Sequence, residues 1–278
     1  MFKNFTVIFV ILCLNLFGTS AWDFYRLRSD DTAELADAPF LAAIMVLRKF
    51  HCNGVIISSQ FILTTAACIL SQRNRIKDIR IRVGTTDLSK GGETYTVQTY
   101  FVHNITTREI EETMLYTVGV FKLEDRIDFG YKQRPIRIGR LPREIFHSDP
   151  WQVALPFLGH YDGKIVGWGK DRRGDGKQFT LRKVTDTVIE RIPRCKRFMN
   201  QAGLTFYNHT LCAFVEYAFF GSDGSVLVYD KTLIGLASYF DVQVLTSTNR
   251  EAYASVFTYV HQVRKFLRNV IDDIYTNI

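Results

Sequence analysis

Short runs of apolar residues recur along the whole chain, and turn-forming residues separate them. Many of the runs are rich in Val, Ile, Phe and Tyr, and runs of this length predict β-strands rather than helices. The predicted strands are 40–46, 54–58, 79–83, 95–102, 116–123, 164–168, 183–191, 226–229 and 233–239. Many short strands joined by turns predict an all-β barrel or sandwich.

Only the carboxyl-terminal end has clear helical periodicity. Apolar residues recur there at intervals of three and four, from Val256 through Val260 and Val263 to Ile274. This spacing predicts an amphipathic helix that docks on the β body. We interpret its basic face as a solvated surface, because the apolar stripe is needed for packing.

The amino terminus has the form of a secretory signal. Lys3 precedes an apolar run over 5–17, and small residues follow to Ser20 and Ala21. The run is shorter than the ~20 residues that a spanning helix needs. We therefore predict a signal peptide over 1–20, no membrane span and a secreted protein. Removal of the signal leaves 278 − 20 = 258 residues, interpreted as a short segment over 21–38 and one domain over 39–278.

Composition and charge exclude several classes of protein. The chain is 47% hydrophobic and 23% charged, which is typical of a folded globular domain. Its net charge of +7 is spread over the whole length, so we do not expect nucleic acid as a partner. Two basic runs, over 73–82 and 191–197, leave an acidic polysaccharide as an alternative partner. Arg80 and Arg82 alternate with apolar residues, so these cations also fit the solvated face of a strand.

The cysteines agree with export. Once the signal is removed, an even set remains: Cys52, Cys68, Cys195 and Cys212. Two disulfides are expected in an extracellular protein, and of the three pairings we favour Cys52–Cys68 with Cys195–Cys212, which closes short loops. No pair has zinc-ligand spacing, so we expect no metal and no cofactor. Two sequons are glycosylation candidates, at Asn104 and Asn208.

A series of motifs resembles the trypsin/chymotrypsin serine-protease family. Residues 52–58 and 61–68 are similar to the family sequence around its catalytic histidine. Further similar pieces follow in the family order, at 118–123, 135–136, 166–169, 211–213, 221–224 and 235–239, and then the final helix. The resemblance spans nearly the whole mature chain. It implies the fold of that family, two perpendicular six-stranded β-barrels with a C-terminal α-helix.

The catalytic residues of the family are missing from these motifs. In the family a histidine takes the proton of a serine hydroxyl, and a carboxylate holds the imidazolium. The resemblance places Ala67 at the histidine, Thr117 at the carboxylate and Asp223 at the serine. A shift of one residue brings Ser222 near the nucleophile position, but a hydroxyl without a base stays protonated. We therefore predict an inactive homologue, not an enzyme.

Activation and substrate binding are predicted to be lost as well. In the family, cleavage frees a new amino terminus, which pairs with a buried aspartate. The new terminus corresponds to 27–30, after Arg26, and the aspartate position corresponds to Ser222. The specificity pocket is expected to be blocked by bulkier residues, which are Tyr217, Phe240 and Glu251. The alternative interpretation is that the aromatic residues fill space that a lost disulfide occupied.

The leading hypothesis is a secreted, non-catalytic serine protease homologue. The resemblance implies a regulatory or scaffolding role toward another secreted protein, such as a protease or a component of a carrier network, in an extracellular fluid. Inactive members of this kind occur in insect secretions. The segment 21–38 has no cysteine, which departs from clip-module members and favours a seminal or other glandular secretion.

Two alternatives stay open beside this hypothesis. One is a protein that binds acidic polysaccharide or glycosaminoglycan, and the other is a hydrolase with residual or unconventional activity. The six histidines lie outside any recognisable motif, so we expect none to replace the missing base: His51, His103, His147, His160, His209 and His261.

Overall fold

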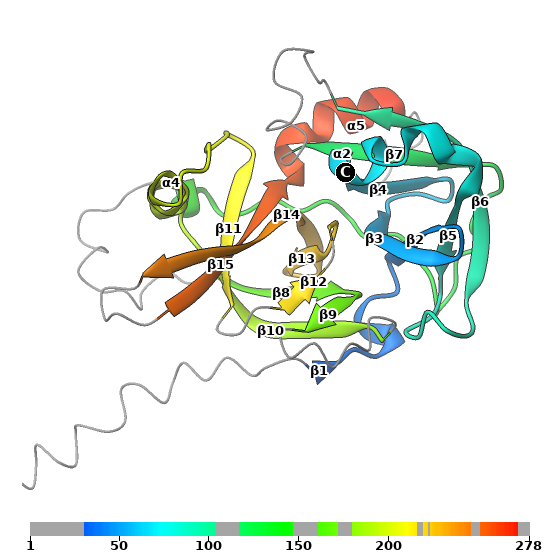
Figure 1. Cartoon of the computed structure of the whole chain (residues 1–278), viewed down its shortest axis with the longest axis horizontal. Coiled ribbons are helices and arrows are strands. Elements are labelled where there is room, and N and C mark those ends of the chain that lie inside the picture. The colour runs from blue at the N-terminus through cyan, green and yellow to red at the C-terminus, as the bar shows by residue number, and fades with distance from the viewer. Residues whose placement is uncertain are drawn as a thin grey trace, which may run out of the picture.

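The computed structural model describes residues 31–103, 117–146, 161–171, 180–215, 219–221, 223–245 and 251–271. Antiparallel strands make up most of this part of the chain, and they form two closed six-stranded barrels (Figure 1). The predicted all-β barrel architecture is therefore confirmed. The predictions for the signal peptide, Arg26, Asn104, Tyr217 and Ser222 lie outside the described residues.

The first barrel uses the strand order β2-β3-β4-β7-β6-β5, and β5 closes the ring on β2. Its strands are β2 (Leu41–Val46), β3 (Lys49–Ile56), β4 (Phe61–Thr65), β5 (Ile79–Val83), β6 (Glu93–Val102) and β7 (Val118–Leu123). The predicted alternation in β5 is present, since Ile79, Ile81 and Val83 are buried and Arg80 is exposed. Apolar side chains from all six strands fill the interior.

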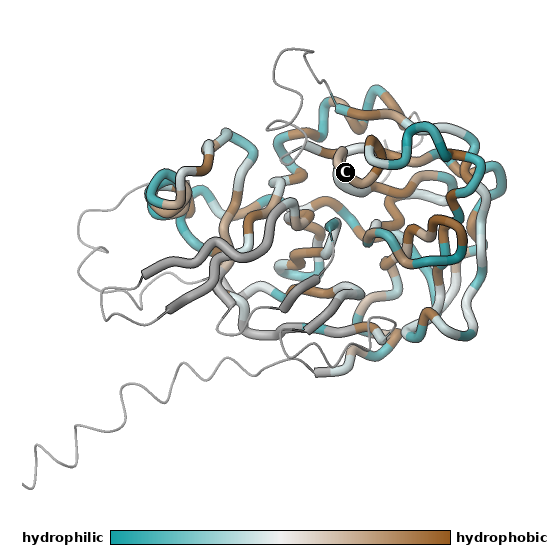
Figure 2. The backbone as a smooth tube through the Cα atoms, viewed as in Figure 1, coloured by the Kyte–Doolittle hydropathy of each residue, from teal (hydrophilic) through white to brown (hydrophobic). Residues whose placement is uncertain are grey.

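The second barrel closes because β10 pairs with both β8 and β11. Its strands are β8 (Tyr161–Gly167), β10 (Arg182–Ile189), β11 (Thr210–Val215), β13 (Val226–Tyr229), β14 (Thr232–Leu245) and β15 (Glu251–Tyr259). The two-residue β1 (Asp31–Thr32) joins the outside of β10, and β9 (Gly169–Asp171) pairs separately with β12 (Phe219–Gly221). Figure 2 shows hydrophobic residues concentrated along the strands and hydrophilic residues in the connecting turns.

The helices correct two predictions. The terminal helix does not begin at Val256, because β15 continues to Tyr259, held by β11 on one side and β14 on the other. A 3₁₀ turn, η5 (Val260–Val263), then leads into α5 (Arg264–Val270). The helix α4 (Ile192–Gln201) was not predicted, although a proline opens it and its buried residues Cys195 and Met199 are four apart.

The remaining helical segments are short. They are α2 (Ala66–Leu70), η2 (Leu35–Asp37), η3 (Arg73–Asp78) and η4 (Arg143–Phe146). None of the helices in the described ranges is long and apolar enough to cross a membrane. Disulfides join Cys52 to Cys68, which ties β3 to α2, and Cys195 to Cys212, which ties α4 to β11. This is the pairing that closes the shortest loops.

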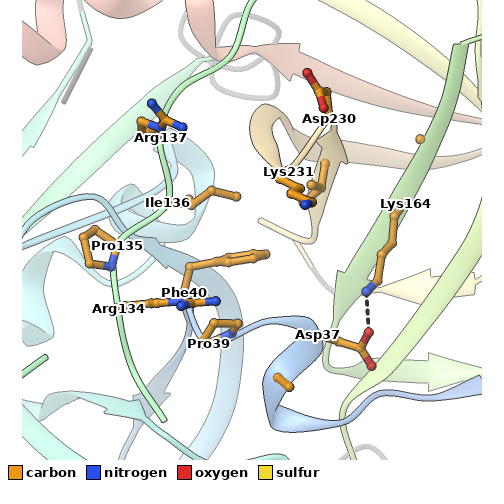
Figure 3. Close-up of a pocket in the computed structure, with 13 residues that line it drawn as sticks. Asp37, Pro39, Phe40, Arg134, Pro135, Ile136, Arg137, Lys164, Asp230 and Lys231 are labelled. Carbon is orange, nitrogen blue, oxygen red and sulfur yellow. Dashed lines mark hydrogen bonds and ion pairs between the residues drawn. The ribbon is translucent and has the colours of Figure 1, made fainter. Parts of the chain in front are cut away.

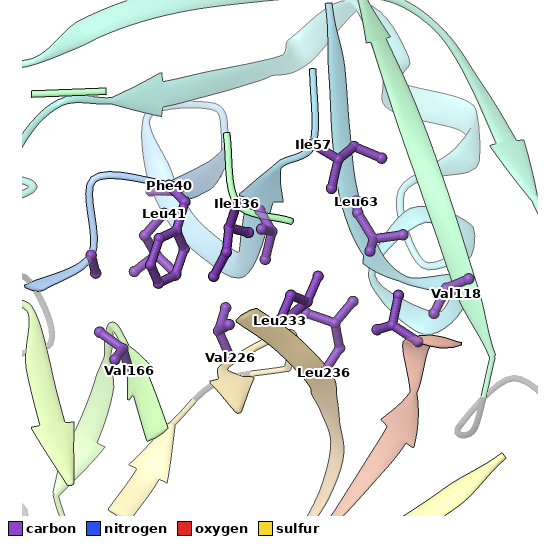
Figure 4. Close-up of a cluster of buried hydrophobic side chains, with 14 of the residues drawn as sticks. Phe40, Leu41, Ile57, Leu63, Val118, Ile136, Val166, Val226, Leu233 and Leu236 are labelled. Atoms are coloured by element: carbon purple, nitrogen blue, oxygen red, sulfur yellow. The ribbon is translucent and has the colours of Figure 1, made fainter. Parts of the chain in front are cut away.

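A hydrophobic layer joins the two barrels. Leu41, Leu63 and Val118 face it from the first barrel, and Val226 and Leu236 face it from the second (Figure 4). Each of these side chains is at most 2% exposed, so the layer is dry and tightly packed. The barrels therefore form one folded body.

Candidate functional site at the junction of the barrels

Asn53 on β3 joins the two barrels through its side chain. Its Nδ2 donates to the carbonyl of Trp168 at 3.0 Å and to Oγ of Ser225 at 3.1 Å, and its Oδ1 accepts from the Trp168 N–H at 2.8 Å. Asn53, Trp168 and Ser225 have no solvent exposure. The Asn53 amide thus makes hydrogen bonds to the N–H and the carbonyl of Trp168, as the backbone of a paired strand would.

The turn that holds Asp223 is clamped at this junction. The backbone N–H of Asn53 donates to the carbonyl of Asp223 at 2.8 Å, and the N–H of Gly224 donates to Ala237 on β14 at 2.9 Å. Gly224 has φ +80°, and a Cβ there would lie 2.1 Å from the Asn53 carbonyl oxygen. Only glycine fits this left-handed conformation and this close approach. The turn therefore presents Asp223 at a defined place between the barrels.

The residues at the other two motif positions lie close to each other. Thr65 caps α2 by accepting from the Cys68 N–H at 3.3 Å, and the Ala66 N–H donates to the Thr117 carbonyl at 2.9 Å. This bond places the first turn of α2, with Ala67, beside the residue that precedes β7. Thr64 links the pair to the Asp223 turn, because its hydroxyl donates to the Asn53 carbonyl at 2.7 Å. The structure thus gathers Ala67, Thr117 and Asp223 at one junction.

Thr117 carries a buried hydroxyl that has no hydrogen-bond partner among the described residues. The residue is 2% exposed, and its backbone carbonyl serves α2. Across the β6–β7 ladder, the ring nitrogen Nδ1 of His103 is also buried and without a partner. Unsatisfied buried polar groups destabilise a fold, typically by about 1 to 3 kcal/mol each. The hydroxyl of Thr117 is therefore expected to cost stability, since no hydrogen bond to a described residue offsets its burial.

One imidazole reaches a serine hydroxyl near this junction, which sequence patterns do not reveal. His51 Nε2 lies 3.0 Å from Oγ of Ser71, at the end of α2. The Ser71 hydroxyl donates to the carbonyl of Cys68 at 3.1 Å. Because its single proton points to that carbonyl, the serine accepts from His51 rather than giving up a proton to it. The pair therefore does not have the arrangement of an activated nucleophile.

Burial favours the neutral forms of two titratable groups at the junction, His51 and Asp223. Burial lowers the pKa of His51, opposed by the Cys68 backbone and by the nearby carboxylate of Asp223. Burial also raises the pKa of the Asp223 carboxyl, and His51 opposes this shift. No ion pair joins these two residues among the described contacts. The junction therefore offers weak acid and base groups that are not in contact.

The structure gives backbone positions for two of the three predicted pocket residues. Tyr217 lies outside the described residues, and Phe240 belongs to β14. The register pairs Glu251 with Leu245, at the far end of the β14–β15 hairpin from Phe240. The buried Ser255 lies much nearer to Phe240 in the ladder than Glu251 does. The backbone positions of Phe240 and Glu251 are therefore separated along the β14–β15 ladder.

A candidate metal group in the described part of the chain lies at the same place. It consists of His51, Cys52 and Cys68, with their ligand atoms within 4.8 Å of one another. Both sulfur atoms are used in the Cys52–Cys68 disulfide. A disulfide sulfur lacks the thiolate charge that binds transition metals, so this group does not fit a metal ion.

Comparison with protein families matches the family described as Trypsin over residues 28–267. The chain belongs to the trypsin family. A solved trypsin-family structure, "neuropsin, a serine protease expressed in the limbic system of mouse brain", superposes with a TM-score of 0.67. The two chains are 17% identical, and the match covers 87% of this chain and 98% of neuropsin.

Curated relatives include proteins named as trypsins and a protein named as an inactive serine protease. A trypsin of Phaedon cochleariae is 25% identical, over 74% of this chain and 75% of its own length. The inactive serine protease scarface of Drosophila melanogaster is 27% identical, over 60% of this chain and 24% of its own length. The family model fixes the family of this chain, and the relatives leave its activity to be argued from its own residues.

Proposed function

We propose that this chain is a secreted, catalytically inactive trypsin-family protein that acts by binding another extracellular protein. The observation that carries the proposal is the residue at the base position. Ala67 stands where the family motif has its histidine, and a methyl group cannot take a proton from an attacking hydroxyl.

The other two positions support the same reading. Thr117 has no charge to balance an imidazolium, and its buried hydroxyl has no hydrogen-bond partner in the described ranges. Asp223 offers a carboxyl group of raised pKa in place of the serine hydroxyl. Loss of the whole triad lowers kcat by about 10⁶ in a serine protease that has been dissected in this way. The retained fold, with its disulfides and packed barrels, then serves as a rigid support for binding loops.

Labelling with a fluorophosphonate tests the absence of catalysis. We expect less than a few hundredths of a mole of probe per mole of this chain, because no base activates a serine. An active trypsin treated in parallel is the positive control, and the variant Ser71→Ala removes the serine that contacts an imidazole. Stoichiometric labelling of the native chain would overturn the proposal. Retention of the label in Ser71→Ala would then assign it to another serine, such as Ser222.

Capture from the native fluid tests the binding role. Crosslinking of the tagged full-length chain should recover the same protein partner in repeated preparations. The exposed Asn208 in the turn before β11 is accessible for a glycan, as expected of a secreted protein. Its glycosylation is measured as a mass loss on enzymatic deglycosylation. A chain that stays inside expressing insect cells would contradict secretion.

Binding to an acidic polysaccharide is the second candidate, favoured by one surface. The β2–β3 turn lies beside the end of η3, since the Leu47 N–H donates to Asp78 at 3.3 Å. Exposed cations gather there, which are Arg48, Lys49, Arg73, Arg75 and Lys77. Arg82 does not contribute in the same way, because its guanidinium is bonded to the carbonyls of Leu88 and Gly91.

The cations of α4 are partly neutralised. Arg194 pairs with Glu190 at 3.5 Å and stacks over the ring of Phe198. A heparin column compares the two basic surfaces through the variants Arg73→Ala/Lys77→Ala and Lys196→Ala/Arg197→Ala. If the η3 surface binds, only the first variant elutes at lower salt. Release of the native chain at 0.15 M salt, roughly physiological strength, would argue against specific binding.

A further inference from the structure

A cavity of about 850 Å³ lies between the segment that contains η2, the linker that joins the barrels, and the β13–β14 turn (Figure 3). It shares no residue with the junction around Asp223. Its volume is in the range of cavities that hold small molecules, roughly 300 to 1,000 Å³. The cavity is therefore large enough for a ligand of its own.

The floor of the cavity is apolar and held in place by the core. Phe40 and Ile136 are each 8% exposed and belong to the hydrophobic layer between the barrels. Figure 3 shows both side chains pointing into the space that Lys231 faces from the opposite side. Pro39 and Val228 complete the apolar lining. Since these residues are packed on one side, the floor is preformed.

The rim of the cavity carries excess positive charge. It has four cations, Arg134, Arg137, Lys164 and Lys231, and two carboxylates, Asp37 and Asp230, so its formal charge is 4 − 2 = +2. Asp37 receives hydrogen bonds from Lys164 at 2.7 Å and from Lys183 at 2.8 Å. One carboxylate thus faces two ammonium groups, and positive charge remains at this end of the cavity.

Three rim cations are available to a ligand. Arg134, Arg137 and Lys231 are exposed, and none of them has an ion-pair partner among the described residues. Lys231 lies in the tight β13–β14 turn, in which Asp230 and Lys231 both have positive φ, 45° and 58°, and its side chain faces the cavity (Figure 3). An ammonium group held over an apolar floor attracts the acid group of a ligand whose body is apolar.

We propose that this cavity binds a small organic anion, an apolar body that bears one carboxylate or sulfonate group. The body lies on Phe40 and Ile136, and the acid group lies at Lys231, within the field of Arg134 and Arg137. This site would let the folded body carry or respond to a small molecule, independently of any protein partner and of any catalytic activity.

Two fluorescent probes test the proposal on the intact, disulfide-bonded chain. The anion 8-anilinonaphthalene-1-sulfonate and the uncharged N-phenyl-1-naphthylamine have the same rings, and only the first has a sulfonate. We expect the sulfonate to bind at one site per chain, at least about tenfold more tightly than the neutral probe, as a 1.4 kcal/mol difference gives. Circular dichroism verifies that each variant is folded.

Variants then locate the site. Arg134→Ala/Lys231→Ala should weaken sulfonate binding about tenfold, since two exposed charge contacts to the sulfonate are lost. Lys265→Ala, an exposed cation on α5, is the matched control and should leave it unchanged. Asp37→Asn should tighten binding, and Ala36→Trp, at the exposed rim, should abolish it. Absent binding, equal binding of both probes, or binding unaffected by Arg134→Ala/Lys231→Ala would overturn the proposal.

Discussion

The amide of Asn53 is predicted to be the most sensitive polar group at the junction of the barrels. The change Asn53→Ala removes the partner of three buried groups, which are the N–H and the carbonyl of Trp168 and the hydroxyl of Ser225. An unsatisfied buried group costs about 1 to 3 kcal/mol. Because Ser225 can rotate its hydroxyl, we expect a total loss of about 3 to 5 kcal/mol in the free energy of unfolding.

Equilibrium urea unfolding, followed by circular dichroism, measures this loss. A loss of this size lowers Tm by on the order of 10 °C in a chain of this length. The control Asn74→Ala removes an exposed asparagine from η3 and should change stability by less than about 0.5 kcal/mol. If Asn53→Ala is no less stable than Asn74→Ala, the reasoning about the junction is wrong.

The isosteric change Asn53→Asp should make the free energy of unfolding depend on pH through the new carboxyl group. A protonated carboxyl still donates to the Trp168 carbonyl, whereas a carboxylate repels it. Burial and this carbonyl raise the pKa of the new group above its unfolded value of about 3.9. The variant should therefore resemble the native chain below about pH 4 and lose stability as the pH rises, by about 1.4 kcal/mol for each unit of the shift. A pH-independent difference would contradict this contact.

Three further outcomes follow from described contacts. Thr117→Val removes an unsatisfied hydroxyl and should raise the free energy of unfolding by about 1 kcal/mol in urea titration, whereas a loss would reveal a partner for that hydroxyl. Cys195→Ser and Cys212→Ser should each lower it by about 2 to 5 kcal/mol, and unchanged melting of both would refute the bridge. Burial alone would raise the pKa of Asp37, but hydrogen bonds from Lys164 and Lys183 lower it to about 2. Stability of about 1 to 2 kcal/mol should thus be present above pH 4 and decline toward pH 2, and this decline should be smaller in Asp37→Asn, measured by Tm across that range.

The strands were predictable where their own side chains alternate or form a continuous apolar run. Both β5 and β13 have the predicted bounds, 79–83 and 226–229. In contrast, β3 begins at Lys49, five residues earlier than predicted, because pairing with β2 rather than any apolar pattern extends it. Val256 fits a helical spacing equally well, and only its two strand neighbours decide against the helix.

The motif positions of the candidate site were visible in the sequence, but its contacts were not. The proposed loss of the base at Ala67 rests on a local motif beside a cysteine. Asn53 meets Trp168 and Ser225 across 115 and 172 residues, a distance that no local pattern reports. The one available signal was a polar residue, Asn53, inside an otherwise apolar buried run. The contact of His51 with Ser71 likewise depends on how α2 ends.

Closure of the two barrels has a consequence for association between copies. A free strand edge is the usual template for aggregation, and a closed ring has none. In the described part of the chain, the strands outside the rings, β1, β9 and β12, are two or three residues long, and β14 continues to Leu245, past its pairing with β13 at Leu236. Among the described residues, the backbone groups available for intermolecular ladders are thus concentrated on that part of β14, and other contacts between copies would have to be specified by side chains.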